Sequence, residues 1–96
     1  MDLAEFQDLM RRTYLDRDER RGRDATFRRM VEEVGELAKA LRREDRAART
    51  EEVSDVLAWL ASLANQAEVD LGEAAARYAD GCPKCGRIPC ACPFGP

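Results

Sequence analysis

The chain has 96 residues, of which 45% are hydrophobic and 36% are charged, and it carries a net charge of −3. This length supports one small domain whose thin core gains from a metal ion or a second subunit. The negative net charge argues against nonspecific binding of nucleic acid, which needs a positively charged surface to attract phosphates. The chain has no histidine, which excludes Ser/His/Asp and Cys/His catalytic sites and metal sites with imidazole ligands.

No apolar run approaches the roughly 20 residues of a membrane span, and the N-terminus lacks a basic segment followed by an apolar signal core. We therefore expect a cytoplasmic protein that binds neither membrane nor nucleic acid. All four prolines and all four cysteines lie after Gly81, and the region before it has helical periodicity in four blocks. The sequence thus predicts an all-α, four-helix domain over residues 1–80 and a cysteine tail over residues 81–96.

The first predicted helix opens with Asp2 and Glu5, which have the spacing of a capping box. Apolar residues then recur at helical steps, at Leu3, Phe6, Met10 and Tyr14. This pattern predicts a helix that ends near Leu15. No later residue continues the apolar stripe until the second helix begins.

A charged segment follows the first helix. It reads DRDERRGRD, residues 16–24, and every residue in it except Gly22 is charged. Gly22 is the natural break within it, and Asp24 is a residue type that caps helix starts. We therefore expect a flexible charged loop between the first and second helices.

The second and third predicted helices carry matching apolar stripes. Adding 26 to the residue number of each member of the first stripe gives a member of the second. The stripes are Phe27, Met30, Val31, Val34, Leu37, Ala38 and Leu41, and Val53, Val56, Leu57, Leu60, Leu63, Ala64 and Ala67. We expect two antiparallel helices that bury these stripes. The charged turn over residues 42–50 joins them, and the third helix begins after Asp45 or after Thr50.

The last predicted helix opens with Asp70 and Glu73, again in capping-box spacing. It is expected to run to about Ala79, where Gly81 stops it. The prolines and cysteines beyond Gly81 favour an irregular tail.

Four acids lie on matching flanks of the two stripes. At about 100° per residue, Glu33 and Glu36 share one flank of the second helix, and Glu52 and Asp55 share the same flank of the third. Packed carboxylates repel one another and lose hydration, so a cation between them would relieve a large penalty. Ligands that are all oxygen suit Mg²⁺ or Mn²⁺. The alternative is a structural network that arginines neutralise.

The sequence EEVGE, residues 32–36, followed by EEVSD, residues 51–55, resembles the EExxE...ExxD motif of MazG-like nucleoside triphosphate pyrophosphohydrolases. The segment LANQAEVDLGEA, residues 63–74, is similar to the family's approach to its last helix. The resemblance implies a helical bundle that forms dimers or tetramers and binds Mg²⁺. It also implies cleavage of a nucleoside triphosphate between its α and β phosphates, giving the monophosphate and pyrophosphate.

The same resemblance implies roles for individual residues. The positions that match the family's metal ligands are Glu33, Glu36, Glu52 and Asp55. Glu32 matches the first acid of the motif, and we hypothesise that it positions or deprotonates the attacking water. Asn65 matches a substrate-side position, and Arg77 stands where family members often have a lysine that contacts phosphate.

Two further features could serve a nucleotide. Trp59 lies one turn beyond Asp55, where its indole could stack on a base, or it could pack in the core or a dimer interface. Eight of the fourteen arginines fall within residues 11–29, and Arg23 and its neighbours could reach a triphosphate from the charged loop. The alternative is that this loop is simply solvated.

The tail places Cys82 and Cys85 in a CxxC and Cys90 and Cys92 in a CxC. Such a set in a cytosolic chain favours tetrahedral Zn²⁺, whereas disulfides and free thiols are the alternatives. Four protein ligands leave no open position, so a zinc site here would be structural.

The function predicted from the sequence is a Mg²⁺-dependent nucleotide pyrophosphohydrolase that clears unwanted nucleotides. A non-catalytic helical interaction module with a structural zinc site is the alternative. A di-iron or manganese redox bundle is disfavoured, because such bundles usually combine glutamates with Glu-x-x-His pairs.

Overall fold

A computed structural model describes residues 1–94, and all of its regular structure is helical. The helices are α1 (Leu3–Arg21), α2 (Arg23–Ala40), α3 (Arg46–Gln66) and α4 (Leu71–Ala76). No strand occurs in the described part of the chain, which confirms the all-α prediction. No helix among these residues has the length and apolar character needed to cross a bilayer.

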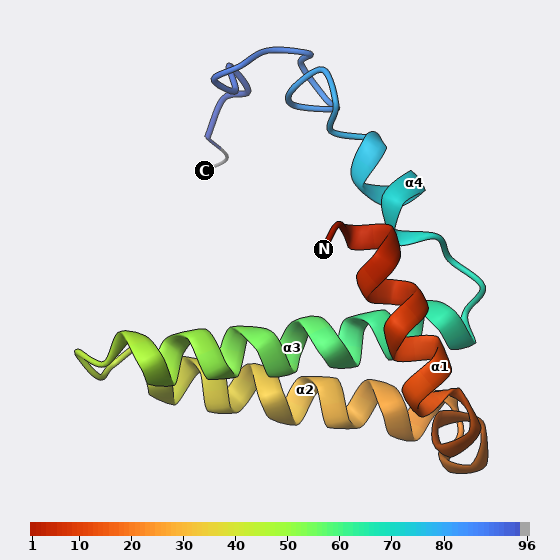
Figure 1. Ribbon diagram of the computed structural model, residues 1–96. Coiled ribbons are helices and arrows are strands. Elements are labelled where there is room, and N and C mark those ends of the chain that lie inside the picture. The colour runs from red at the N-terminus through yellow and green to blue at the C-terminus, as the bar shows by residue number, and fades with distance from the viewer. Residues whose placement is uncertain (95–96) are drawn as a thin grey trace.

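The helices α2 and α3 form a long antiparallel pair, and α1 crosses this pair near the end of α3 (Figure 1). The short α4 lies beside the start of α1, and the tail continues from it away from the helix pair (Figure 1). The buried core lies at this crossing. Ala61, Ala64 and Leu71 form it, with Leu3, Phe6 and Met10 of α1 packed against them.

Aspartate caps begin three of the four helices. Asp2 forms the expected capping box with Glu5, and Asp70 accepts a hydrogen bond from the backbone N–H of Glu73. Asp45 accepts from the N–H groups of Ala47 and Ala48, at 3.0 and 3.2 Å. These bonds satisfy donors that have no partner within the helix. The third helix therefore begins after Asp45, the earlier of the two predicted positions.

The predicted end of the first helix near Leu15 is wrong, and so is the predicted loop over residues 16–24. Helix α1 continues to Arg21, and only Gly22, with φ of +92°, separates it from α2. The polar segment stays helical because its groups find local and tertiary partners. Asp18 pairs with Arg21 at 2.8 Å, and Gln66 of α3 donates to the Asp18 carbonyl oxygen.

Two smaller predictions at helix ends also fail. Asp24 does not cap α2, since that helix begins at Arg23 with Gly22 in the cap position. Helix α4 ends at Ala76 and not near Ala79, because the following residues form tighter i to i−3 turns up to Gly81.

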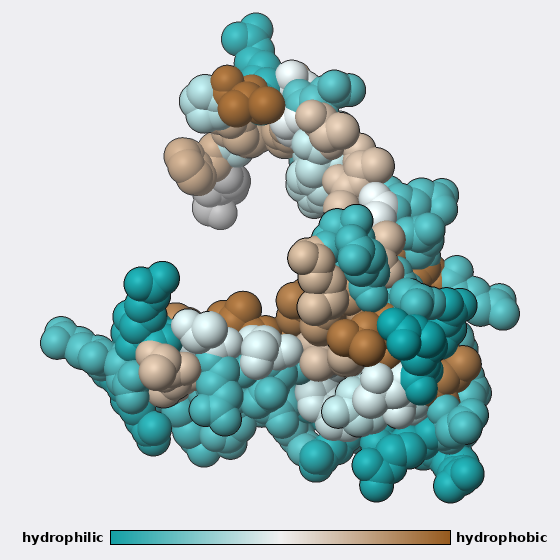
Figure 2. Space-filling model, in the orientation of Figure 1, coloured by the Kyte–Doolittle hydropathy of each residue, from teal (hydrophilic) through white to brown (hydrophobic). Residues whose placement is uncertain are grey.

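The apolar stripes of α2 and α3 are not buried as predicted. Of their members only Ala64 is buried, and Phe27 and Val31 are each 50% exposed. The other large exposed members are Val34, Leu41, Val53, Leu57 and Leu60. Figure 2 shows apolar surface along the α2–α3 pair, on the side below the tail. One helix pair is too thin to cover both stripes, so a single chain leaves this apolar surface in water.

We expect Asp45→Ala to lower the unfolding free energy by about 1 kcal/mol, because α3 loses the acceptor for its first N–H groups. In a domain of this size the midpoint of thermal unfolding should fall by roughly 4–8 °C. Differential scanning fluorimetry measures this shift. Glu44→Ala in the same turn is the control, since Glu44 is exposed and makes no side-chain hydrogen bond among the described residues. Equal shifts in the two variants would contradict the capping role.

Candidate functional site

Three of the four predicted acids meet where α2 packs against α3. Glu33 of α2 and the α3 residues Glu52 and Asp55 offer carboxylate oxygens that all lie within 4.8 Å of one another. Each of the three is half-buried. Glu52 and Asp55 share a flank because three residues separate them, which is close to one helical turn.

The fourth acid, Glu36, lies outside this three-carboxylate cluster. It is exposed, and its carboxylate pairs with Lys39 one turn further along α2, at 3.5 Å. Its charge nevertheless reaches the cluster, because it is among the groups that raise the pKa of Glu52. The sequence therefore predicted the helix flanks on which the acids lie, but it did not predict that Glu36 pairs with Lys39.

Glu52 is held in an electrostatically unfavourable position. Burial raises the pKa of its carboxyl, and repulsion from Asp55 and then Glu33 raises it further. Its Oε2 atom is buried and has no hydrogen-bond partner among the described residues. A buried carboxylate oxygen without a partner is an unfavourable arrangement that a ligand would relieve.

Arginines do not neutralise the cluster. The ion pairs of this region join Arg29 to Glu32 and Lys39 to Glu36, and none in the described chain involves Glu33, Glu52 or Asp55. The structural network considered from the sequence is therefore not formed. Oxygen donors alone, one of them without a partner, fit a hard divalent cation such as Mg²⁺.

Glu32 is exposed and lies outside the cluster. Its carboxylate receives a hydrogen bond from Arg29, one turn earlier in α2, at 3.1 Å. The same Arg29 lies over the Trp59 ring, 5.3 Å from its centroid. Glu32 is thus linked through Arg29 to the tryptophan and not directly to the three acids.

A pocket of about 380 Å³ adjoins the cluster, and Asp55 belongs to both. Its wall is built mainly from α1 and α3, with Tyr14, Arg17, Arg21, Arg29 and Trp59 among the lining residues. The guanidinium carbon of Arg21 lies 4.8 Å from the centroid of the half-buried Trp59 ring. Trp59 therefore lies beside Asp55, as the first of the two sequence interpretations expected, and the arginines over its ring are the part that neither interpretation described.

Sequence reasoning missed the contribution of α1 to this pocket. Tyr14, Arg17 and Arg21 recur at steps of three and four residues, which would have placed them on one helix face had the segment been predicted as helical. The predicted Arg23 is the first residue of α2, is exposed, and does not line the pocket. Arg20, which the predicted loop included, lies within α1.

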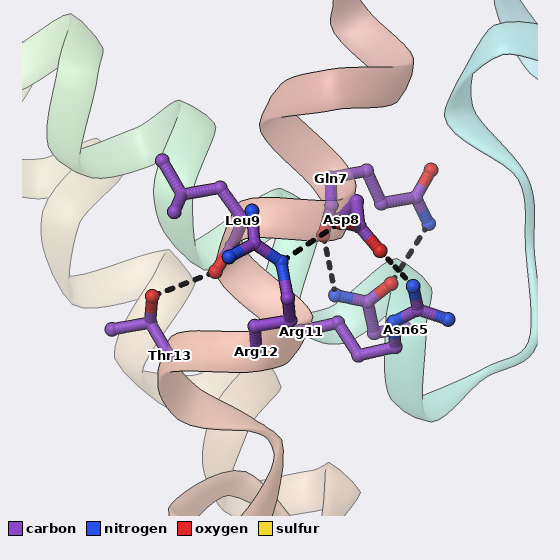
Figure 3. Close-up of polar contacts among 7 residues, drawn as sticks. All are labelled: Gln7, Asp8, Leu9, Arg11, Arg12, Thr13 and Asn65. Carbon is purple, nitrogen blue, oxygen red and sulfur yellow. Dashed lines mark hydrogen bonds and ion pairs between the residues drawn. The ribbon is translucent and has the colours of Figure 1, made fainter.

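Asn65 lies away from the acids, in a network that joins α1 to α3 and α4. Figure 3 shows Asn65 bonded to Gln7, whose side chain donates to Asn65 Oδ1 at 3.1 Å and whose carbonyl oxygen accepts from Asn65 Nδ2 at 3.2 Å. Gln7 also accepts from the N–H of Leu71 at 2.7 Å. The polar atoms of Asn65 are thus occupied within the fold. Arg77 is exposed at the end of α4 and does not line this pocket either.

The tail forms a second cluster of possible metal ligands. The sulfur atoms of Cys82, Cys85, Cys90 and Cys92 lie within 4.8 Å of one another, and all four are free thiols. Hydrogen bonds from the backbone N–H groups of Ala91 and Arg87 lower the pKa of Cys85 to about 6. The four cysteines and three of the four predicted acids are therefore brought together, at separate places in the chain.

The family model for the MazG nucleotide pyrophosphohydrolase domain matches residues 21–84. This range contains α2, α3 and α4, with the three-carboxylate cluster and Trp59. Most of α1 and three of the four cysteines lie outside it. Comparison with curated proteins gives no significant match.

We expect Glu52→Gln to raise the midpoint of thermal unfolding of the metal-free protein at pH 7, because glutamine removes a charge that its neighbours repel. Below the ordinary carboxyl pKa of 4.5, Glu52 is protonated in both folded and unfolded chains, so the two proteins should converge. As the pH rises through the raised folded pKa, wild type should lose stability relative to the variant. Thermal melts in a chelating buffer, with Glu44→Gln as control, measure this, and a lower midpoint for Glu52→Gln alone would contradict it.

Proposed function

Because the chain belongs to the MazG nucleotide pyrophosphohydrolase family, we propose that it is a Mg²⁺-dependent hydrolase of nucleoside triphosphates. The reaction is attack of water on the α–β phosphate linkage, which gives a ribo- or deoxyribonucleoside monophosphate and pyrophosphate. Its role is removal of unwanted nucleotides in the cytoplasm. The observation that carries the proposal is the cluster of Glu33, Glu52 and Asp55, with its unpartnered oxygen, beside an arginine-lined pocket.

Glu33, Glu52 and Asp55 would hold the metal, and Glu36 would join them by exchanging its exposed pair with Lys39 for the ion. Bound Mg²⁺ supplies positive charge to phosphate oxygens and to the water that attacks. Phosphoryl transfer depends mainly on such charge neutralisation and on alignment, with little need for a covalent nucleophile. A protein without histidine can therefore carry out this reaction.

The pocket provides groups for the rest of the substrate. Arg21 and Arg29 line the same pocket as Asp55, and their guanidinium groups are suited to phosphate oxygens. The exposed part of the Trp59 ring offers a surface on which a base can stack. A nucleotide bound here would displace part of the arginine contact with the indole, because the same surface is used for both.

Glu32 is our candidate for positioning the attacking water. It is accessible, and its partner Arg29 belongs to the pocket wall. A carboxylate that forms an exposed ion pair can turn from its arginine at little energetic expense, since such pairs contribute about 0–1 kcal/mol. Asn65 and Arg77 are not assigned to substrate, because their positions lie outside this pocket.

A second copy of the chain would cover the exposed apolar stripes of α2 and α3. These stripes continue along the helices that hold the acids, so a dimer or tetramer formed through them would also shield the carboxylate cluster from bulk water. Removal of water strengthens the interaction of the acids with a cation. We therefore propose that the active form is a homo-oligomer.

The activity is tested by pyrophosphate release from a panel of ribo- and deoxyribonucleoside triphosphates with Mg²⁺. We expect Glu52→Gln to reduce turnover by about 100-fold or more, because lost metal stabilisation of several kcal/mol corresponds to at least that factor. It should also abolish the rise in thermal midpoint on Mg²⁺ addition. Glu32→Gln should reduce turnover but retain that rise, and Glu44→Gln should change neither.

Two results would overturn these assignments. A folded, oligomeric wild-type protein that releases no pyrophosphate from any substrate would favour the non-catalytic interaction module. Equal loss of turnover and of Mg²⁺ stabilisation in Glu32→Gln would remove Glu32 from its proposed role.

Oligomerisation is tested by light scattering after size exclusion. We expect the wild type to have the mass of a dimer or tetramer and Phe27→Glu to shift it to monomer, because a charge would enter the apolar interface. Tyr78→Glu is the matched control, since Tyr78 is also aromatic and exposed but lies outside the helix pair. A monomeric wild type at micromolar concentration would contradict the proposal.

A further inference from the structure

The tail adopts a defined path without a hydrophobic core. None of the described residues 81–94 is buried, and Ile88 and Phe94 are almost fully exposed. Yet the backbone closes a compact turn, in which the N–H of Gly86 donates to the Cys82 carbonyl oxygen at 2.7 Å. Apolar burial cannot offset the entropy lost in ordering such a segment. Another interaction must hold it.

The four sulfur atoms have the spacing of ligands around one centre. Cys82 Sγ lies 3.7 Å from Cys92 Sγ, and Cys85 Sγ lies 4.0 Å from Cys90 Sγ. A tetrahedron with metal–sulfur bonds of about 2.3 Å has edges of about 3.8 Å. The two observed separations bracket this value, whereas a disulfide would bring a pair to about 2.05 Å.

The backbone around the sulfurs is arranged to support negative charge on them. The N–H groups of Ala91 and Cys92 donate to the sulfurs of Cys85 and Cys90, each at 3.3 Å. Such donors orient metal-bound ligands and stabilise their charge. Gly86 has φ of +71°, a conformation that favours glycine, and this lets the chain turn directly after Cys85.

From these observations we propose that Cys82, Cys85, Cys90 and Cys92 bind one Zn²⁺ in a closed, structural site. Four thiolates in tetrahedral array select a soft ion and leave no coordination position for a substrate. The site is chemically distinct from the oxygen cluster of α2 and α3. Its role is to cross-link residues 81–94, which then stand as a rigid extension of α4.

The attachment to α4 depends on Gly81. This residue has φ of +104°, and a Cβ placed on it would lie 2.5 Å from Ile88 Cγ1 and 2.9 Å from the Arg87 carbonyl oxygen. The loop between the two cysteine pairs thus closes directly on the residue that precedes Cys82. A side chain at position 81 would push this loop away without removing a ligand.

Metal analysis of the full-length chain, purified under reducing conditions and loaded with Zn²⁺, tests the site. We expect about one zinc per chain that survives gel filtration, and loss of at least nine-tenths of it in Cys85→Ser. Replacement by Co²⁺ should give the visible absorption of tetrahedral cobalt with sulfur-to-metal charge transfer. Zinc retention does not depend on hydrolysis, so this result stands apart from the activity assay.

A variant that keeps all four thiols provides the second arm. We expect Gly81→Ala to weaken zinc affinity about tenfold or more in competition with a chromophoric chelator, because its strained backbone must shift. Lys84→Ala, an exposed change within the tail, should leave affinity unchanged. Wild-type protein that retains no zinc, that holds iron instead, or that forms Cys82–Cys92 and Cys85–Cys90 disulfides under reducing conditions would overturn the proposal.

Discussion

Where α2 packs against α3, Glu33 meets Glu52 and Asp55, and the packing energy of two helices is set against the repulsion of three carboxylates. No basic side chain of the described residues pairs with any of them. The helix pair therefore holds unfavourable electrostatic free energy in the absence of a ligand. In the proposed metal site a divalent cation would convert this into binding affinity, so the same arrangement that weakens the fold would create the site. The structural constraint behind the site is that the flank of α2 with Glu33 faces the flank of α3 with Glu52 and Asp55.

Helix α1 turns this cluster into a pocket. It crosses near the end of α3 and is fixed there by Gln7, which bonds to Asn65, and by Gln66, which reaches the carbonyl oxygen of Asp18. These contacts set the position of Arg17 and Arg21 relative to Trp59. Asn65, which the family resemblance placed on the substrate side, and Asp18, which was predicted to lie in a loop, both take part in hydrogen bonds that join α1 to α3. They hold in place the helix that forms one wall of the pocket.

Periodicity and capping predicted the parts of this structure that depend on local interactions. The four helices, the caps at Asp2 and Asp70, and the shared flank of Glu33, Glu52 and Asp55 all follow from spacing along the chain. Residues 16–21 could not be placed in the same way, because their helix lacks an apolar stripe and is held by ion pairs and by contact with α3.

The prediction that the apolar stripes of α2 and α3 are buried failed for a different reason. A stripe of Phe27, Val31 and Val34 shows that an apolar surface exists, but not whether the same chain or another one covers it. Glu36 illustrates a third limit, since a helical wheel gives the direction of Cα–Cβ but not the choice between a cluster and a neighbouring lysine.

Gly22 joins the two helices that supply the arginines of the pocket. It is the sole residue between α1 and α2, and Arg21 on one side of it and Arg29 on the other both lie over Trp59. A change in the angle between the two helices would separate these guanidinium groups on the indole. Since the chain has a single tryptophan, its intrinsic fluorescence should respond to the angle between α1 and α2, without any added label.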